Sequence, residues 1–216
     1  LFKNFGPENH LSYQFVRAIT QDEQGFIWLG SHEGLHRFDG YQFLSFHHDT
    51  SKPNSLSSDV ISSMVIDDKN RFWIGTSGGG LNLYQEKTRD FLHIKSESET
   101  ASLTNNVVNI LFEDSKGSLW VGTESGLNIV TESNGKIEVK KILQQLGNTK
   151  SLTHNTIHDI AESSDKEIWV ATLGGGVSVF DLEGNFERSV KFGTVDLSDY
   201  SNKFVNALHI DKTTVW

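Results

Sequence analysis

Residues Val108 to Val130 read VNILFEDSKGSLWVGTESGLNIV, and this stretch decides the fold. It begins with an apolar, β-branched run, which is typical of a strand buried on both faces. The segment Asp114-Ser-Lys-Gly117 then predicts a tight turn, because Asp can accept hydrogen bonds from the following amides and Gly can adopt a positive φ. A second strand carries Trp120, and a Gly-containing loop leads to a third strand. The stretch therefore predicts three short strands joined by tight turns.

The same pattern recurs along the chain, and tryptophan marks each copy. The five tryptophans are 45, 47, 49 and 47 residues apart, at Trp28, Trp73, Trp120, Trp169 and Trp216. A fourth, more variable strand is expected after each third strand, for example at Phe91–Ile94. Four strands in a period of about 45 residues are typical of a β-propeller blade. A large aromatic side chain on the second strand would fill the space between neighbouring blades, so we expect these tryptophans to be core residues.

Two segments carry a resemblance to a known repeat. Gln21 to Ser31 reads QDEQGFIWLGS and Asp114 to Thr123 reads DSKGSLWVGT, and both resemble the two-component regulator propeller repeat. The linking segments Asn54-Ser-Leu-Ser57 and Lys150-Ser-Leu-Thr153, each placed before an inner strand, are similar to that family too. The resemblance recurs five times and covers nearly the whole chain.

The fourth repeat departs from the pattern at three positions. Ser163 replaces the turn Asp, Lys166 replaces the turn Gly, and Ala171 replaces the Gly that follows the Trp strand. Because all three changes touch turns or strand ends, we expect them to make blade four less regular without changing its fold.

The resemblance implies an all-β fold made of β-propeller blades of four antiparallel strands. Family propellers have about seven blades, so this chain is expected to hold about four and a half of them, as a fragment of a longer protein. The expected blades cover approximately residues 11–55, 56–102, 103–151 and 152–199, with an incomplete blade at 200–216. Leu1 is expected to be a mature amino terminus, and Trp216 falls within an expected strand.

The composition excludes several classes of site. Cysteine is absent, so no disulfide, thiolate nucleophile or cysteine metal site can form. The net charge of -9 repels phosphate backbones, which disfavours nucleic acid as a partner. No run approaches the roughly 18 apolar residues of a membrane span, so membrane contact is expected only through segments absent from this chain.

The candidate binding face follows from propeller geometry. The loop that leads into an inner strand and the loop between the second and third strands lie on one face, the usual ligand surface of a propeller. Amide, hydroxyl and aromatic side chains that meet there suit a sugar-like ligand. The candidate ligand-binding residues are Tyr13, Gln14, Arg17, His32, Glu33, Asp59, Asn105, Asn106, Asn109, His154, Asn155 and His158.

Some of these candidates have a simpler explanation. Asn, Ser and Asp in such loops also serve to form turns, whereas turns do not require Tyr13, Arg17, His32, His154 or His158. One polar residue near the start of each inner strand differs between the repeats, whereas the residue directly before it is apolar in every repeat. This pattern suits positions that line a central channel. These residues are Arg17, Ser62, Asn109, His158 and Asn206.

The resemblance implies a ligand-sensing, periplasmic module of a bacterial receptor, placed ahead of a membrane helix and a histidine kinase or GGDEF diguanylate cyclase output. The expected ligand is a carbohydrate or nutrient-derived molecule, and a homodimer is expected because such receptors signal through a pair of chains. No cofactor is expected. No metal is expected either, since adjacent His47 and His48 would point to opposite faces of a strand and could not share one ion.

Two other functions stay open. The first is a propeller lyase or hydrolase that acts on polysaccharide, although the sequence has no nucleophile motif and only His158 beside Asp159 resembles an acid–base pair. The second is a protein-interaction scaffold, which a large exposed apolar patch would indicate. We expect this region not to be an enzyme.

Overall fold

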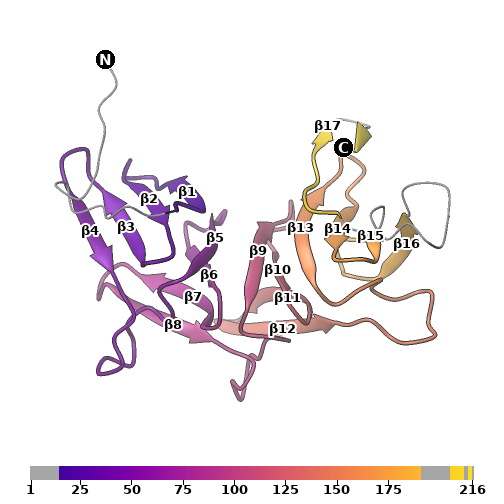
Figure 1. The fold of residues 1–216 in the computed structure, drawn as a ribbon, viewed down its shortest axis with the longest axis horizontal. Coiled ribbons are helices and arrows are strands. Elements are labelled where there is room, and N and C mark those ends of the chain that lie inside the picture. Colours follow the sequence, from indigo (N-terminus) through magenta and orange to yellow (C-terminus); the bar gives the residue numbers. More distant parts are fainter. Residues whose placement is uncertain (1–14, 191–204, 212–213, 216) are drawn as a thin grey trace.

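The computed structural model describes residues 15–190, 205–211 and 214–215, and these residues form strands and no helix. Four sheets follow one another along the chain, each made of four strands in sequence order (Figure 1). Every pairing within these sheets is antiparallel. The predicted all-β fold of four-stranded blades is confirmed.

The strands are short and evenly distributed. Blade 1 contains β1 (Ala18–Gln21), β2 (Ile27–Gly30), β3 (Leu35–Phe38) and β4 (Phe43–Phe46). Blade 2 contains β5 (Ile61–Ile66), β6 (Phe72–Thr76), β7 (Gly80–Gln85) and β8 (Asp90–Ile94). Blade 3 contains β9 (Val108–Glu113), β10 (Leu119–Thr123), β11 (Gly126–Ser133) and β12 (Lys136–Ile142). Blade 4 contains β13 (Ile157–Glu162), β14 (Ile168–Thr172), β15 (Gly176–Phe180) and β16 (Phe186–Val190), and the short pair β17 (Ile210–Asp211) and β18 (Thr214–Val215) follows.

The first strand of each blade is the innermost. The inner strands β1, β5, β9 and β13 lie next to one another in this order. In Figure 1 they occupy the concave side of an arc, and the outer strands β4, β8, β12 and β16 lie on its convex side. This radial arrangement is that of propeller blades around a common axis.

The hydrophobic cores lie between blades. Trp28, Trp73 and Trp120 are at most 2% exposed, which confirms their predicted core role. Each indole shares its core with an equivalent residue from the inner strand of the following blade: Met64 for Trp28, Leu111 for Trp73 and Ile160 for Trp120. The repeat therefore encodes packing between blades.

The Gly after the Trp strand permits the close approach of the next blade. A Cβ at Gly75 would lie 2.6 Å from Cγ1 of Val108, and a Cβ at Gly122 would lie 2.6 Å from Cγ2 of Ile157. No side chain fits in such a space without movement of the neighbour. Ala171 holds the equivalent position in blade 4 and is fully buried.

The turn Asp of each repeat binds the indole of the same blade. The Trp28, Trp73 and Trp120 Nε1 atoms donate to Asp22, Asp67 and Asp114 at 2.7, 2.8 and 2.7 Å. In blade 4 Ser163 is too short for this role. Within the described part of the chain, the buried Trp169 Nε1 makes no hydrogen bond of ordinary geometry, although the Glu167 carboxylate interacts with it. Blade 4 nevertheless forms a complete four-stranded sheet, so the departures of the fourth repeat are local.

Candidate functional site

Two kinds of loop meet at one end of the inner strands. One kind leads into an inner strand, and the other joins the second and third strands of a blade. In blade 2 the amide of Ser77 donates to the carbonyl of Val60 at 2.8 Å, and Gly78 donates to Asn106 of the next blade at 3.0 Å. Blade 3 repeats this linkage through Glu124 and Gly126. We call the resulting surface the loop rim; it comprises residues 31–34, 57–60, 77–79, 104–107, 124–125, 153–156 and 173–175.

A buried polar contact holds each leading loop on its own blade. The amide of Ser57 donates to Asn82 Oδ1 at 3.1 Å, and the amide of Thr104 donates to Asn128 Oδ1 at 2.9 Å. Both asparagine side chains are fully buried. The Ser57 and Thr104 hydroxyls also accept from Asn82 and Asn128 Nδ2, at 2.7 and 2.9 Å, which explains the Ser or Thr after the buried leucine in the linking segments.

Three of the predicted ligand residues anchor the rim. The Oδ1 atoms of Asp59, Asn106 and Asn155 accept hydrogen bonds from the backbone amides of His48, Ser96 and Gln144, at 2.6, 2.8 and 2.8 Å. Each bond ties a leading loop to the segment that follows the outer strand of the preceding blade. The side chains of these three candidates are therefore committed to structure at the contacting oxygen.

Two further candidates form turns. Asn105 Oδ1 accepts from the amide of Val107 at 2.7 Å, and His154 Nδ1 accepts from the amide of Thr156 at 3.1 Å. His154 thus takes the turn role that the sequence analysis assigned to Asn, Ser and Asp. Because its Nδ1 accepts, the ring carries its neutral-state proton on Nε2, which stays available as a donor.

A β-bulge reorients one polar residue on the inner strand of blades 2, 3 and 4. The pairing of β5 with β6 passes from Ile61 to Ser63 and skips Ser62, and equivalent shifts skip Asn109 and His158. Bulges re-aim side chains, and they occur often beside functional sites. We call Ser62, Asn109 and His158 the bulge row. The sequence pattern had singled out all three as channel-lining positions, but not the bulge.

Two members of the bulge row, Asn109 and His158, contact the segment that follows their own blade. Asn109 Nδ2 donates to the carbonyl of Ile157 at 2.9 Å and to Glu124 Oε1 at 3.1 Å. His158 Nδ1 lies 3.2 Å from Asn206 Oδ1. The Ser62 hydroxyl is buried and has no hydrogen-bond partner among the described residues. Glu124 was not among the twelve candidates. Its position directly before the Ser-Gly of a rim loop is the sequence feature that could have identified it.

Blade 1 supplies the remaining candidates. Arg17 is exposed and directly precedes β1. His32 and Glu33 are exposed in the loop between β2 and β3, where the His32 ring lies 6.4 Å from that of Phe15. Tyr13 and Gln14 lie outside the described residues.

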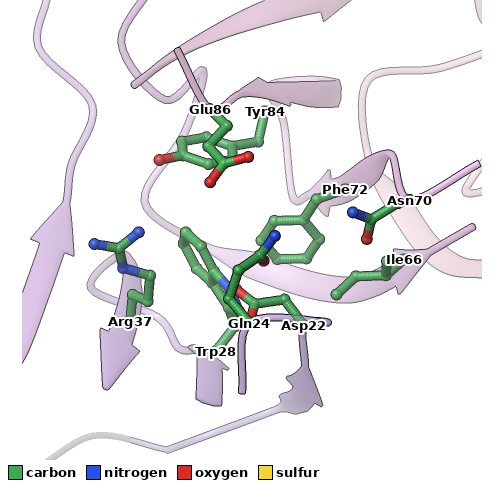
Figure 2. A pocket seen from close by; sticks show the side chains of 9 residues that line it. All are labelled: Asp22, Gln24, Trp28, Arg37, Ile66, Asn70, Phe72, Tyr84 and Glu86. Carbon is green, nitrogen blue, oxygen red and sulfur yellow. The ribbon is translucent and has the colours of Figure 1, made fainter. Parts of the chain in front are cut away.

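A small cavity of about 60 Å³ lies between blades 1 and 2, away from the rim (Figure 2). Its lining residues are Asp22, Gln24, Trp28, Arg37, Ile66, Asn70, Phe72, Tyr84 and Glu86. The turn of Asp22 and Gln24 and the rim loop at His32 stand at opposite ends of β2, so the cavity does not belong to the rim. Its volume suits a few water molecules.

No metal centre or membrane helix is found in the described ranges. Groups of three or more His, Asp or Glu side chains that could hold a metal ion do not occur there. Across those same residues, no helix has the length and apolar character to cross a membrane.

Comparison with known proteins agrees with this architecture. Residues 10–33, 55–78, 102–125 and 151–174 match the family described as the two component regulator propeller. The chain is 37% identical over 57 residues to Histidine kinase P4 of Formosa agariphila, which covers 26% of this chain and 4% of that protein.

Solved structures show the same fold. The extracellular domain of the putative hybrid two component system BT3049 from B. thetaiotaomicron matches with a TM-score of 0.73 and 26% identity, over 87% of this chain and 26% of that one. The extracellular domain of the putative one component system BT4673 from the same organism matches with a TM-score of 0.58 and 17% identity, over 95% and 35%. This chain thus spans only part of each relative, and it is a propeller module of the kind found in extracellular domains of two-component systems. Its four matched segments are repeats of the two-component regulator propeller, as the resemblance in the sequence predicted.

Proposed function

We propose that this chain is the ligand-sensing part of a bacterial two-component or diguanylate-cyclase receptor, located in the periplasm and working as one of a pair of chains. Its similarity to the extracellular domain of a hybrid two-component system supports this proposal. The sensing surface is the loop rim together with the bulge row.

The observation that carries the proposal is the bulge row. Three consecutive blades place a polar side chain at the same level of the inner strand through the same local irregularity. A residue that served only the sheet would need no bulge. In blades 3 and 4 the device places Asn109 and His158, which are partly exposed, on a polar surface that the two blades share.

The chemistry of this surface favours a neutral, hydroxyl-rich ligand. Both Nδ2 hydrogens of Asn109 bind within the protein, so Asn109 presents its Oδ1 beside the Glu124 carboxylate, and His154 Nε2 adds a donor. Sugar hydroxyls can donate and accept at once, so they match mixed sets of this kind. The acidic net charge disfavours anionic ligands. A carbohydrate is therefore the proposed ligand class.

The proposed module does not catalyse a reaction. The Asp159 carboxylate accepts hydrogen bonds from the amides of Ile160 and Leu208, at 2.9 and 2.7 Å. His158 instead faces Asn206, so these neighbours do not form an acid–base pair. Polysaccharide turnover should be absent in the unmodified chain, and turnover lost on His158→Ala would contradict this view.

The binding site is tested by Asn109→Ala. Neutral oligosaccharides are screened by titration calorimetry, and the best ligand is then measured against variants. Loss of the Asn109 amide should weaken binding about tenfold, since one good polar contact contributes on the order of 1 kcal/mol or more. Asn185→Ala is the matched control, because Asn185 binds Asp181 in the turn before β16, away from the rim. Equal affinity of both variants would remove the bulge row from the site.

A further inference from the structure

Two histidines lie close together beneath the rim loop of blade 1. His36 is on β3 and only 2% exposed, and His47 directly follows β4. Their ring centroids are 6.1 Å apart. Positions equivalent to His36 hold Asn82 in blade 2 and Asn128 in blade 3, so blade 1 has a titratable residue where its neighbours have a neutral one.

The hydrogen bonds of His36 define its neutral form. The Ser31 hydroxyl donates to the carbonyl of Gly34 at 3.1 Å, so it accepts from His36 Nε2 at 3.3 Å. The proton of the neutral ring is therefore on Nε2, and Nδ1 accepts from the Ser45 hydroxyl at 2.8 Å. A second proton on Nδ1 would face that hydroxyl hydrogen, and the Ser45 bond would have to break or reverse.

The surroundings oppose this second proton. Burial lowers the pKa of His36, and the nearby His47 lowers it further, while Glu33 acts in the opposite direction. Asp59, on the loop leading into blade 2, faces His47 at 3.8 Å between its Oδ1 and Nδ1. Among the described residues, Glu33 on one loop and Asp59 on the other are charged groups next to the pair.

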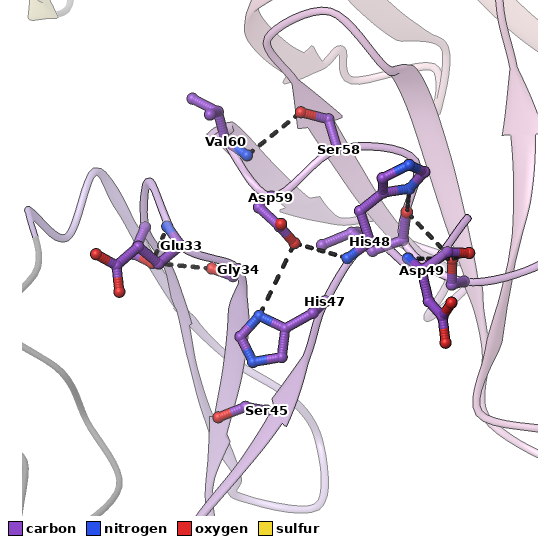
Figure 3. Close-up of polar contacts among 12 residues, drawn as sticks. Glu33, Gly34, Ser45, His47, His48, Asp49, Ser58, Asp59 and Val60 are labelled. Atoms are coloured by element: carbon purple, nitrogen blue, oxygen red, sulfur yellow. Dashed lines mark hydrogen bonds and ion pairs between the residues drawn. The ribbon is translucent and has the colours of Figure 1, made fainter. Parts of the chain in front are cut away.

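His47 connects the two rim loops (Figure 3). Its ring packs so closely on Gly34 that a Cβ there would lie 2.9 Å from Nδ1, and the same Nδ1 lies 3.8 Å from Asp59 Oδ1. The first loop carries the exposed candidates His32 and Glu33, and the second leads into β5. A change in the charge of the pair therefore acts on both loops.

We propose that His36 and His47 form a proton-sensitive joint of the rim, in which protonation of buried His36 disrupts its bond to Ser45, disturbs the packing of His47 on Gly34 and weakens ligand binding at that edge. Its effect on binding rests on the proposed function, whereas its effect on the fold does not. The sign follows from linkage. His36 accepts a proton more readily in the unfolded chain than in the folded one, so its contribution is fully present above the ordinary value of about 6.5 and is lost as the pH falls toward the lower pKa of the folded state.

A second histidine pair lies close by and must be separated in the test. His48 Nδ1 and His93 Nε2 donate to the carbonyls of Leu56 and Ser55, both at 2.8 Å or less. Burial lowers the pKa of His93, although its bond to Ser55 works against this. His93 therefore also destabilises the fold in acid, so the effect of His36 is measured as a difference between variants.

The test is His36→Asn, which places in blade 1 the residue found in blades 2 and 3. Urea unfolding midpoints are measured from about pH 7.5 to 5, and the ring of His36 is followed by NMR over the same range. As the pH falls, the urea midpoint should decrease more in the unmodified chain than in His36→Asn, and the His36 ring should titrate below its ordinary pKa. The control His209→Asn alters an exposed ring in another blade and should keep the unmodified pH dependence.

Equal pH dependence of the chain and His36→Asn, or a His36 ring that titrates at its ordinary pKa, would overturn the joint. If His36→Asn does not fold, the ring titration alone decides. With the oligosaccharide found for the rim, acid should weaken binding by roughly threefold or more in the unmodified chain but not in His36→Asn. A low-titrating His36 ring in a chain that binds no oligosaccharide would support the joint and remove the proposed function.

Discussion

At the scale of single residues, the pairing of the turn Asp with Trp explains the most regular part of the repeat. One oxygen of Asp114 accepts from the amides of Lys116 and Ser118, and the other accepts from Trp120 Nε1. The carboxylate thus closes the turn and satisfies a buried indole at once. Blade 4 tests the value of this arrangement, because Ser163 Oγ retains only a 3.2 Å contact with the amide of Glu167.

Ser163→Asp should therefore stabilise the chain. The new carboxylate can reach the buried Trp169 N–H, and satisfying such a group adds about 1 kcal/mol to the free energy of unfolding. Urea unfolding measures the change. Ser164→Asp adds the same charge one residue away, on an exposed side chain, and should give no gain. A gain of the same size in both variants would show that charge alone is responsible.

At the scale of strands, the close contact between a second strand and the next inner strand sets the spacing of the blades. Gly30, Gly75 and Gly122 all leave the space that a side chain from β5, β9 or β13 fills. The inner strands can therefore lie near the axis, where their bulges turn Ser62, Asn109 and His158 away from the regular pairing.

Gly75→Ala should push blades 2 and 3 apart. Overpacking of this kind costs roughly 1–3 kcal/mol, and thermal or urea unfolding would record the loss. The double variant Gly75→Ala, Val108→Ala removes the side chain that the new methyl group would meet. Its loss in free energy of unfolding should therefore be smaller than the sum of the losses of the two single variants. Simple additivity of the two costs would mean that the contact does not control the spacing.

At the scale of the whole molecule, successive blades cover one another in one direction. The inner-strand residues Leu111 and Ile160 are each 4% exposed because the tryptophan of the preceding blade lies against them. Ile19 holds the equivalent position in blade 1 and is 70% exposed among the described residues. Ile19 is apolar, like the equivalent residues that pack against a tryptophan. The total of seven blades stays a prediction.

A matched pair of substitutions checks this difference. Leu111→Asp should destabilise the chain by several kcal/mol, because it places an unpaired charge in a core. Ile19→Asp should change the free energy of unfolding by less than about 0.5 kcal/mol, as is usual at an exposed site. In a longer protein in which a further blade covers Ile19, both substitutions should become costly. Equal costs in the present chain would mean that Ile19 is already covered.

The sequence alone determined the repeat, the four strands of each blade and the burial of Trp28, Trp73 and Trp120, because these depend on local patterns of apolar residues and turns. Trp169 is only partly buried, and Trp216 lies outside the described residues. It also identified the polar positions of the inner strands. Only the tertiary structure decided that Asp59, Asn106 and Asn155 anchor loops, and that Asn109 turns toward Glu124. These roles depend on hydrogen bonds between residues ten or more positions apart, or between blades, and such pairings exist only once the sheets have packed around their axis.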